Sequence, residues 1–208
     1  LFLFGNTTLQ AQNDIGGWLM LFGDAQVKNA PVKFNYELQN RNHKFTSDLN
    51  QLLVRGNVQY TGIENLNLAL GYAYVLSEKQ EEPNLPFREH RIFQEVMTKQ
   101  QLSKVTFRHR FRFEQRWFDE AEFRTRARYQ FKVMIPWFEG EKGNSFYTTA
   151  YSELFINTNK TKEVQNVFDR NRVSLGKGYR FNKKFAVQAA YMVQLYEKGN
   201  DPQITVGI

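Results

Sequence analysis

The feature that most constrains this fold is an alternation of apolar and polar residues with a period of two. From Val105 to Trp117 the odd positions are mostly large and apolar, whereas the even positions hold four arginines, Thr106 and Glu114. Residues 122–133 repeat the pattern, with three arginines on one face and Phe, Tyr and Val on the other. Successive side chains of a strand point to opposite faces, so each segment predicts a strand with an aromatic face and an arginine face. A helix would scatter these arginines around its circumference, which makes a helix a poor fit.

Weaker copies of this alternation, separated by turn signals, cover the rest of the chain. We expect eleven strand segments, at 14–25, 31–42, 48–60, 65–77, 88–101, 104–117, 121–135, 146–158, 167–181, 185–197 and 202–208. Bacterial single-chain membrane barrels have an even number of strands, so this count predicts ten or twelve. No boundary divides the chain, which predicts one barrel domain over 12–208.

Composition agrees with an all-β chain whose apolar residues are finely interleaved. Aromatic residues make up 15% of the 208 residues and hydrophobic residues 41%, yet the mean hydropathy is −0.59. No stretch approaches the roughly 18 to 20 apolar residues of a membrane helix, which excludes a helical membrane protein but not a membrane barrel. The chain has no Cys, so disulfides, thiolate catalysis and Cys-ligated metals are excluded.

Three features predict that the apolar face points outward, into a membrane. The strand segments are mostly about 11 to 15 residues long, enough for a tilted crossing of a bilayer. The polar face carries small residues such as Gly71 and Gly176, which a narrow lumen holding long arginines needs. Tryptophans and tyrosines lie near strand ends, as in an aromatic girdle. The candidate girdle residues are Trp18, Tyr74, Trp117, Trp137 and Tyr179. The expected fold is therefore an antiparallel up-and-down transmembrane β-barrel with a polar, arginine-rich lumen.

The first eleven residues are uncharged and read as the end of a signal peptide, with Ala11 as the last residue removed. This interpretation predicts export to the outer membrane of a Gram-negative bacterium. The expected partners are membrane lipid and lipopolysaccharide, together with a membrane-protein partner that the sequence does not identify. The longest connections are expected at 78–88, 136–145 and 158–167. The first and third fit the outer surface, but strict alternation of the strands puts 136–145 on the opposite side.

The arginine row predicts a lumen charge network. Pairing residues whose numbers sum to 238 places Arg116 opposite Glu122 and Glu114 opposite Arg124, with a three-residue turn at 118–120. It also places Arg112 opposite Arg126, and like charges directly opposite are destabilising, so carboxylates from other strands are required. The candidates are Glu37, Glu95 and Glu153, because alternation along their strands puts them on the same face as the arginines. The candidate network consists of Arg108, Arg110, Arg112, Glu114, Arg116, Glu122, Arg124, Arg126, Arg128, Glu153 and Arg172.

Two functions remain open for this row. The first is a structural or accessory barrel in which arginines and glutamates pair and fill the lumen. The second is a narrow anion-preferring channel, which the net charge of +7 favours. Nucleic acid is not an expected partner, because binding it would need aromatic side chains on the arginine face, and here they point the other way.

An enzyme is the third and least favoured alternative, as a lipid-modifying barrel with its catalytic residues on the outer wall. The chain has only His43, His90 and His109. His109 points outward by parity, but the register above puts no serine beside it. No metal-ligand spacing and no glycine-rich phosphate loop appears, so no catalytic residue, metal or cofactor is expected.

Several motifs together are similar to one known family. They are Phe-Glu-Gln-Arg-Trp at 113–117, Phe-Arg-Thr-Arg-Ala-Arg-Tyr at 123–129, Glu-Leu-Phe-Ile-Asn at 153–157, the arginine- and glycine-containing run at 168–181, and Gly-Tyr-Ala-Tyr at 71–74. These segments resemble the bacterial family called domain of unknown function 2490, over most of the chain from Asp14 onward. The resemblance implies an exported outer-membrane barrel and implies no activity.

Overall fold

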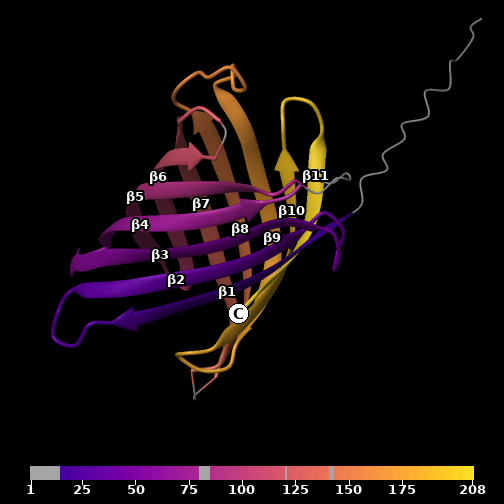
Figure 1. Cartoon of the computed structure of the whole chain (residues 1–208). Coiled ribbons are helices and arrows are strands. Elements are labelled where there is room, and N and C mark those ends of the chain that lie inside the picture. Colours follow the sequence, from indigo (N-terminus) through magenta and orange to yellow (C-terminus); the bar gives the residue numbers. More distant parts are fainter. Residues whose placement is uncertain (1–14, 80–84, 120, 141–142) are drawn as a thin grey trace, which may run out of the picture.

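The computed structural model describes residues 15–79, 85–119, 121–140 and 143–208, which form one closed barrel of eleven strands (Figure 1). The strands are β1 (Gly16–Gln26), β2 (Val32–Asn42), β3 (Leu49–Ile63), β4 (Leu66–Ser77), β5 (Phe87–Leu102), β6 (Val105–Phe118), β7 (Arg124–Glu139), β8 (Ser145–Asn157), β9 (Phe168–Arg180), β10 (Ala186–Leu195) and β11 (Asn200–Gly207). Each strand is antiparallel to its neighbours in sequence, and β1 pairs with β11 in parallel to close the barrel. The prediction of an even strand number is therefore wrong, because a parallel seam allows an odd one. No helix that could cross a membrane is present in the described ranges.

Strand β7 resolves the conflict over the connection at 136–145. The strand continues through Pro136 to Glu139, with a register shift between Pro136 and Phe138. A proline cannot donate a hydrogen bond to the sheet, so it is tolerated within a strand at such an irregularity. The connection to β8 is therefore shorter than the predicted 136–145, because residues 136–139 belong to the strand. The signal-peptide prediction at 1–11 lies outside the described residues.

The two ends of the barrel differ in their connections. One end, the long-loop end, joins β2 to β3, β4 to β5, β6 to β7, β8 to β9 and β10 to β11, and includes the long connection at 158–167. The other end, the short-turn end, includes two-residue turns at 64–65 and 103–104. Asn65 and Ser103 have φ values of 58° and 53° in these turns. The predicted connections at 78–88 and 158–167 therefore fall at the same end.

The barrel wall is apolar outside and polar inside. Leu70, Leu175 and Leu19 are 59%, 62% and 57% exposed on the outer face. Charged and amide side chains face inward and are buried, among them Glu37, Gln39, Glu89, Arg91, Glu95, Arg112, Glu114, Arg126, Arg128, Glu153 and Arg172. This inversion of the usual globular pattern follows the alternation seen in the sequence.

Trp18 corrects one girdle assignment. It lies inside the lumen and is 8% exposed, because Leu19 and Leu21 take the outer face of β1. Trp117 and Trp137 are exposed on the outer wall. Tyr74 packs against His90, and Tyr179 against Phe181, on positions that share the outer parity.

The interior is asymmetric. Long charged side chains project from β5, β6 and β7, whereas β10, β11 and the Gly176–Gly178 segment of β9 present mostly smaller, uncharged residues. At Gly176, for example, a Cβ atom would lie 2.4 Å from the Cβ of Ala190, so a larger residue would not fit there. The small-residue wall leaves room for a cavity beside the charged side chains.

Candidate functional site

The charge network starts from the pairing of β6 with β7, whose register differs from the predicted one by two residues. Arg116 lies opposite Arg124, Glu114 opposite Arg126, and Arg112 opposite Arg128. The predicted Arg116–Glu122 and Glu114–Arg124 pairs are therefore wrong. Strand β6 ends at Phe118 and β7 begins at Arg124, so the connection is longer than three residues. A shift of two keeps every side chain on its predicted face, because the strand period is two.

Glu114 is the hub of the network and is 1% exposed. Its carboxylate accepts hydrogen bonds from Arg126 Nη2 at 2.7 Å and from Arg128 Nη1 at 2.6 Å. Arg112 Nη1 lies 3.5 Å from the same carboxylate. One glutamate thus faces three guanidinium groups in a site closed to bulk water.

Carboxylates from the strands on either side neutralise the like charges of β6 and β7. Glu153 of β8 accepts from Arg128 Nη2 at 2.6 Å and from Arg110 Nη2 at 2.8 Å. Glu95 of β5 lies 2.5 Å from Arg112 Nη2 and 3.7 Å from Arg110 Nε. The arginines are thereby shared between carboxylates, an arrangement that offsets the cost of burying them.

Sequence reasoning missed other members of this network. Glu89, 1% exposed, accepts from Arg91 Nε and Arg116 Nε, each at 2.5 Å. Glu37, already a candidate carboxylate from the sequence, pairs with Arg55, which was missed. Asp169, also missed, accepts from Arg126 Nη1 at 2.7 Å. Glu89 and Arg91 could have been predicted, because they alternate in the same strand with Glu95 and therefore share its inner face. No such pattern marked Asp169, because it lies at a register shift between β8 and β9.

Two buried phenylalanines support the arginines from within the lumen. The guanidinium carbon of Arg112 lies 4.5 Å from the ring centroid of Phe93, and that of Arg128 lies 4.3 Å from the centroid of Phe155. A guanidinium over an aromatic face is attracted by the ring quadrupole, more strongly when desolvated. Parity would have placed both rings inside, since Phe93 lies between Arg91 and Glu95 in sequence.

Four predicted members lie outside the network. Arg108 is exposed near the short-turn end, directly opposite Lys99 and Lys132. Glu122 accepts a hydrogen bond from the backbone of Lys162, and Arg124 pairs with Glu163 at 3.4 Å. Arg172 faces the lumen but hydrogen-bonds to Gln194 rather than to a carboxylate.

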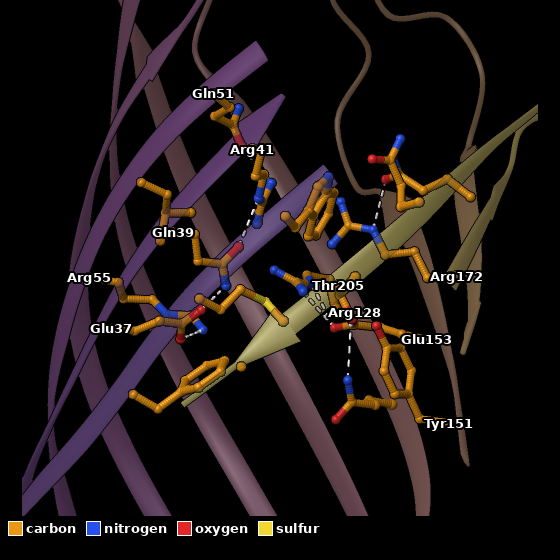
Figure 2. Close-up of a pocket in the computed structure, with 18 of the residues that line it drawn as sticks. Glu37, Gln39, Arg41, Gln51, Arg55, Arg128, Tyr151, Glu153, Arg172 and Thr205 are labelled. Atoms are coloured by element: carbon orange, nitrogen blue, oxygen red, sulfur yellow. Dashed lines mark hydrogen bonds and ion pairs between the residues drawn. The ribbon is translucent and has the colours of Figure 1, made fainter. Parts of the chain in front are cut away.

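A cavity of about 590 Å³ lies beside the network (Figure 2). Among its described lining residues are Arg41, Arg55, Arg91, Arg110, Arg116, Arg126, Arg128, Lys132, Arg170, Arg172 and Lys184, against the acidic Glu37, Glu153 and Asp201. Figure 2 shows Glu37 and Arg55 on one side of the close-up and Arg128 and Glu153 on the other. The charged side chains that border the cavity are therefore predominantly basic.

This cavity is lined by residues from both ends of the barrel. Asn50 and Tyr196 lie at the long-loop end, whereas Lys184 and Ile208 lie at the short-turn end. Burial raises the pKa of the Tyr196 phenol, whose oxygen accepts a hydrogen bond from Arg170 at 3.0 Å. The hydroxyl therefore remains neutral and contributes no charge to this end of the cavity.

His90 and His109 stand apart from the lumen site, whereas His43 lies 3.0 Å from the side-chain nitrogen of Asn50, which lines the cavity. On the outer wall, His109 Nδ1 lies 2.8 Å from the hydroxyl of Tyr129, and its ring packs 5.0 Å from that of Phe131. His90 Nδ1 lies 2.5 Å from the hydroxyl of Tyr72. Within the described ranges, no three His, Asp or Glu residues gather as a metal ion would need.

Fold and site together define a closed β-barrel with an apolar exterior and an ion-paired, basic interior. The chain belongs to the family described as protein of unknown function (DUF2490), whose match covers residues 15–205. It is also 30% identical, over 168 residues, to an uncharacterised protein of Methylorubrum extorquens; the match covers 78% of this chain and 71% of that protein. No solved structure matches the chain.

Proposed function

We propose that this protein is an integral outer-membrane β-barrel with a narrow passage that prefers small anions. The observation that carries the membrane part is the inverted wall. Leu70 and Leu175 are more than half exposed outside, while Glu114 and Arg112 are 1% and 4% exposed inside. Large apolar patches on a protein surface mark a membrane or partner interface, and an outer band of this kind suits lipid. Membrane lipid and lipopolysaccharide would then be the surrounding partners.

Tryptophan quenching by brominated lipid tests the membrane part. Three variants that each keep one tryptophan would be refolded into vesicles that contain brominated acyl chains. Trp117 and Trp137 lie on the outer wall and should be quenched, whereas Trp18 lies in the lumen and should not. Heat-modifiable migration in a detergent gel would report the folded barrel. A protein that stays soluble without detergent, or equal quenching of all three tryptophans, would reject membrane insertion.

The basic cavity supports the anion passage. Its lining reaches both ends of the barrel, and the described residues that border it include eleven basic and three acidic side chains. A pore lined by one sign of charge concentrates counter-ions and repels ions of the same sign. The smaller residues of β10 and β11 provide the space beside the ion network.

Conductance in planar bilayers tests the passage. In a KCl gradient, we expect small unitary currents whose reversal potential has the sign for chloride. Lys132→Glu should shift that potential toward the potassium value, because Lys132 borders the cavity. Glu163→Gln, on an exposed loop, is the matched control and should leave it unchanged. A folded, inserted barrel that carries no current at any voltage would reject the passage.

The second candidate is a structural or accessory barrel with a closed lumen. The density of ion pairs around Glu114 and Glu153 favours it, because a packed network stabilises a wall without needing flow. The same conductance measurement separates the two candidates. The enzyme alternative gains nothing from His109, whose nitrogen faces a phenol and whose ring packs on Phe131.

A further inference from the structure

Two lumen arginines differ from those of the network in their partners. Arg41 of β2 donates from Nε to Gln39 Oε1 at 2.7 Å and from Nη1 to Gln51 Oε1 at 2.5 Å. Arg172 of β9 donates from Nε to Gln194 Oε1 at 2.8 Å. Among the described residues, neither guanidinium has a carboxylate within ion-pair distance, whereas Arg112, Arg126 and Arg128 all do. Neutral amides hold Arg41 and Arg172 in place without cancelling their charge.

Trp18 brings these two cations together. The guanidinium carbon of Arg41 lies 4.0 Å from the indole centroid, and that of Arg172 lies 5.0 Å from the same centroid. The separation of the two guanidinium carbons therefore cannot exceed the sum of these two distances. Like charges this close, and largely removed from bulk water, repel each other. An anion bound between them would relieve the repulsion.

Both arginines line the cavity with guanidinium nitrogens that have unused hydrogen-bond donors. In the described part of the chain, no hydrogen bond is formed by either Nη atom of Arg172 or by Nη2 of Arg41. Figure 2 shows Arg41 entering the close-up from above and Arg172 entering it from the right. A guanidinium fork matches the two oxygens of a carboxylate or phosphate, which it binds in bidentate fashion. Met20 and Leu53 add apolar surface to the same cavity.

We propose that Arg41, Arg172 and Trp18 form a binding site for a small, water-soluble organic anion that carries a carboxylate or phosphate group. The anionic group lies at the two guanidinium forks, and the organic part lies against Trp18, Met20 and Leu53. A cavity of about 590 Å³ falls within the range of small-molecule pockets. The inference rests on the proposed function in one respect, namely that the lumen is open to solvent.

Trp18 itself can report binding. In a Trp117→Phe, Trp137→Phe background it is the sole tryptophan, since the chain has three. The folded barrel in detergent micelles would be titrated at constant ionic strength with sodium benzoate and, separately, with inorganic phosphate. We expect a saturable change in fluorescence with at least one of them. Benzyl alcohol, which has the ring without the charge, should give no saturable change over the same range.

Substitutions then locate the site. Arg172→Gln and Arg41→Gln should each weaken binding at least tenfold, because each removes one charged fork. Arg180→Gln is the matched control, since this arginine lies over Tyr147 at the short-turn end and does not line the cavity. Heat-modifiable migration confirms that each variant is folded, and if one arginine variant fails to fold, the other carries the same test.

The proposal is overturned if neither anion gives a saturable change, or if Arg180→Gln weakens binding as much as Arg172→Gln. These results are independent of conductance. Benzoate binding in a barrel without current would keep the site and reject the passage, whereas anion current without binding would reject the site alone.

Discussion

Substituting Glu114 by Gln should destabilise the barrel more than any change to an exposed ion pair. The carboxylate is 1% exposed and accepts hydrogen bonds from Arg126 and Arg128, with Arg112 at 3.5 Å. Glutamine keeps the shape of the side chain but removes the charge, so three buried guanidinium groups lose a shared counter-ion.

The expected loss follows from what these arginines keep. Removing one partner of a buried ion pair costs about 3–5 kcal/mol. Arg126 retains Asp169 at 2.7 Å, and Arg128 retains Glu153 at 2.6 Å, so the loss should lie near the lower end of that range. About 3 kcal/mol corresponds to roughly a hundredfold change in the unfolding equilibrium. Urea titration of the barrel in lipid vesicles, followed by gel mobility and tryptophan fluorescence, measures it.

Glu163→Gln is the matched control. It also breaks one arginine–glutamate pair, with Arg124 at 3.4 Å, but the Glu163 side chain is 47% exposed. Exposed pairs contribute about 0–1 kcal/mol, so this variant should be nearly as stable as the parent. Equal losses for Glu114→Gln and Glu163→Gln would refute the idea that the lumen network holds the barrel together.

Two further substitutions test the packing and the outer wall. In Gly71→Ala, the new Cβ would lie 2.2 Å from a ring carbon of Phe93, so the ring must move, and the free energy of unfolding should fall by about 1–3 kcal/mol in the same urea titration. Leu70→Arg places a charge at a 59% exposed mid-strand position and should lower the free energy of unfolding in vesicles by about 2–4 kcal/mol. Leu102→Arg, beside a turn, should lower it by only about 0–1 kcal/mol. Equal costs at the two leucines would contradict a lipid-facing wall.

The sequence was sufficient to predict the faces of the strands but not their register. Alternation places Arg112 and Glu114 on the inner face regardless of which residues they pair with. A register shift of two residues leaves the face of each side chain unchanged. The error of two residues arose at the connection between β6 and β7, where nothing in the local sequence fixes how far each strand extends. The even strand number failed for a similar reason, since the parallel pairing of β1 with β11 joins segments that are far apart in sequence.

The candidate site was predictable where charge and parity agreed. Arg110, Glu153 and their neighbours lie in the regular parts of long strands, so their common location follows from the pattern. For Trp18 the prediction was wrong because its place near a strand end is typical of an aromatic girdle, whereas alternation with Leu19 and Leu21 puts it on the inner face. The pairing of Arg41 and Arg172 around its ring is a tertiary contact between β2 and β9, which no local pattern encodes.

The ion pairs of the lumen also constrain the order in which the barrel assembles. Arg110 and Glu153 are 43 residues apart in sequence, and so are Arg126 and Asp169. An arginine that faced lipid at the middle of a bilayer would cost about 2–4 kcal/mol. In the bilayer proposed above, β5, β6, β7 and β8 therefore cannot enter singly, because each would expose charges whose partners lie on strands still outside. Ion pairing among these strands has to accompany insertion, which makes their pairing and their entry into the membrane a single cooperative event.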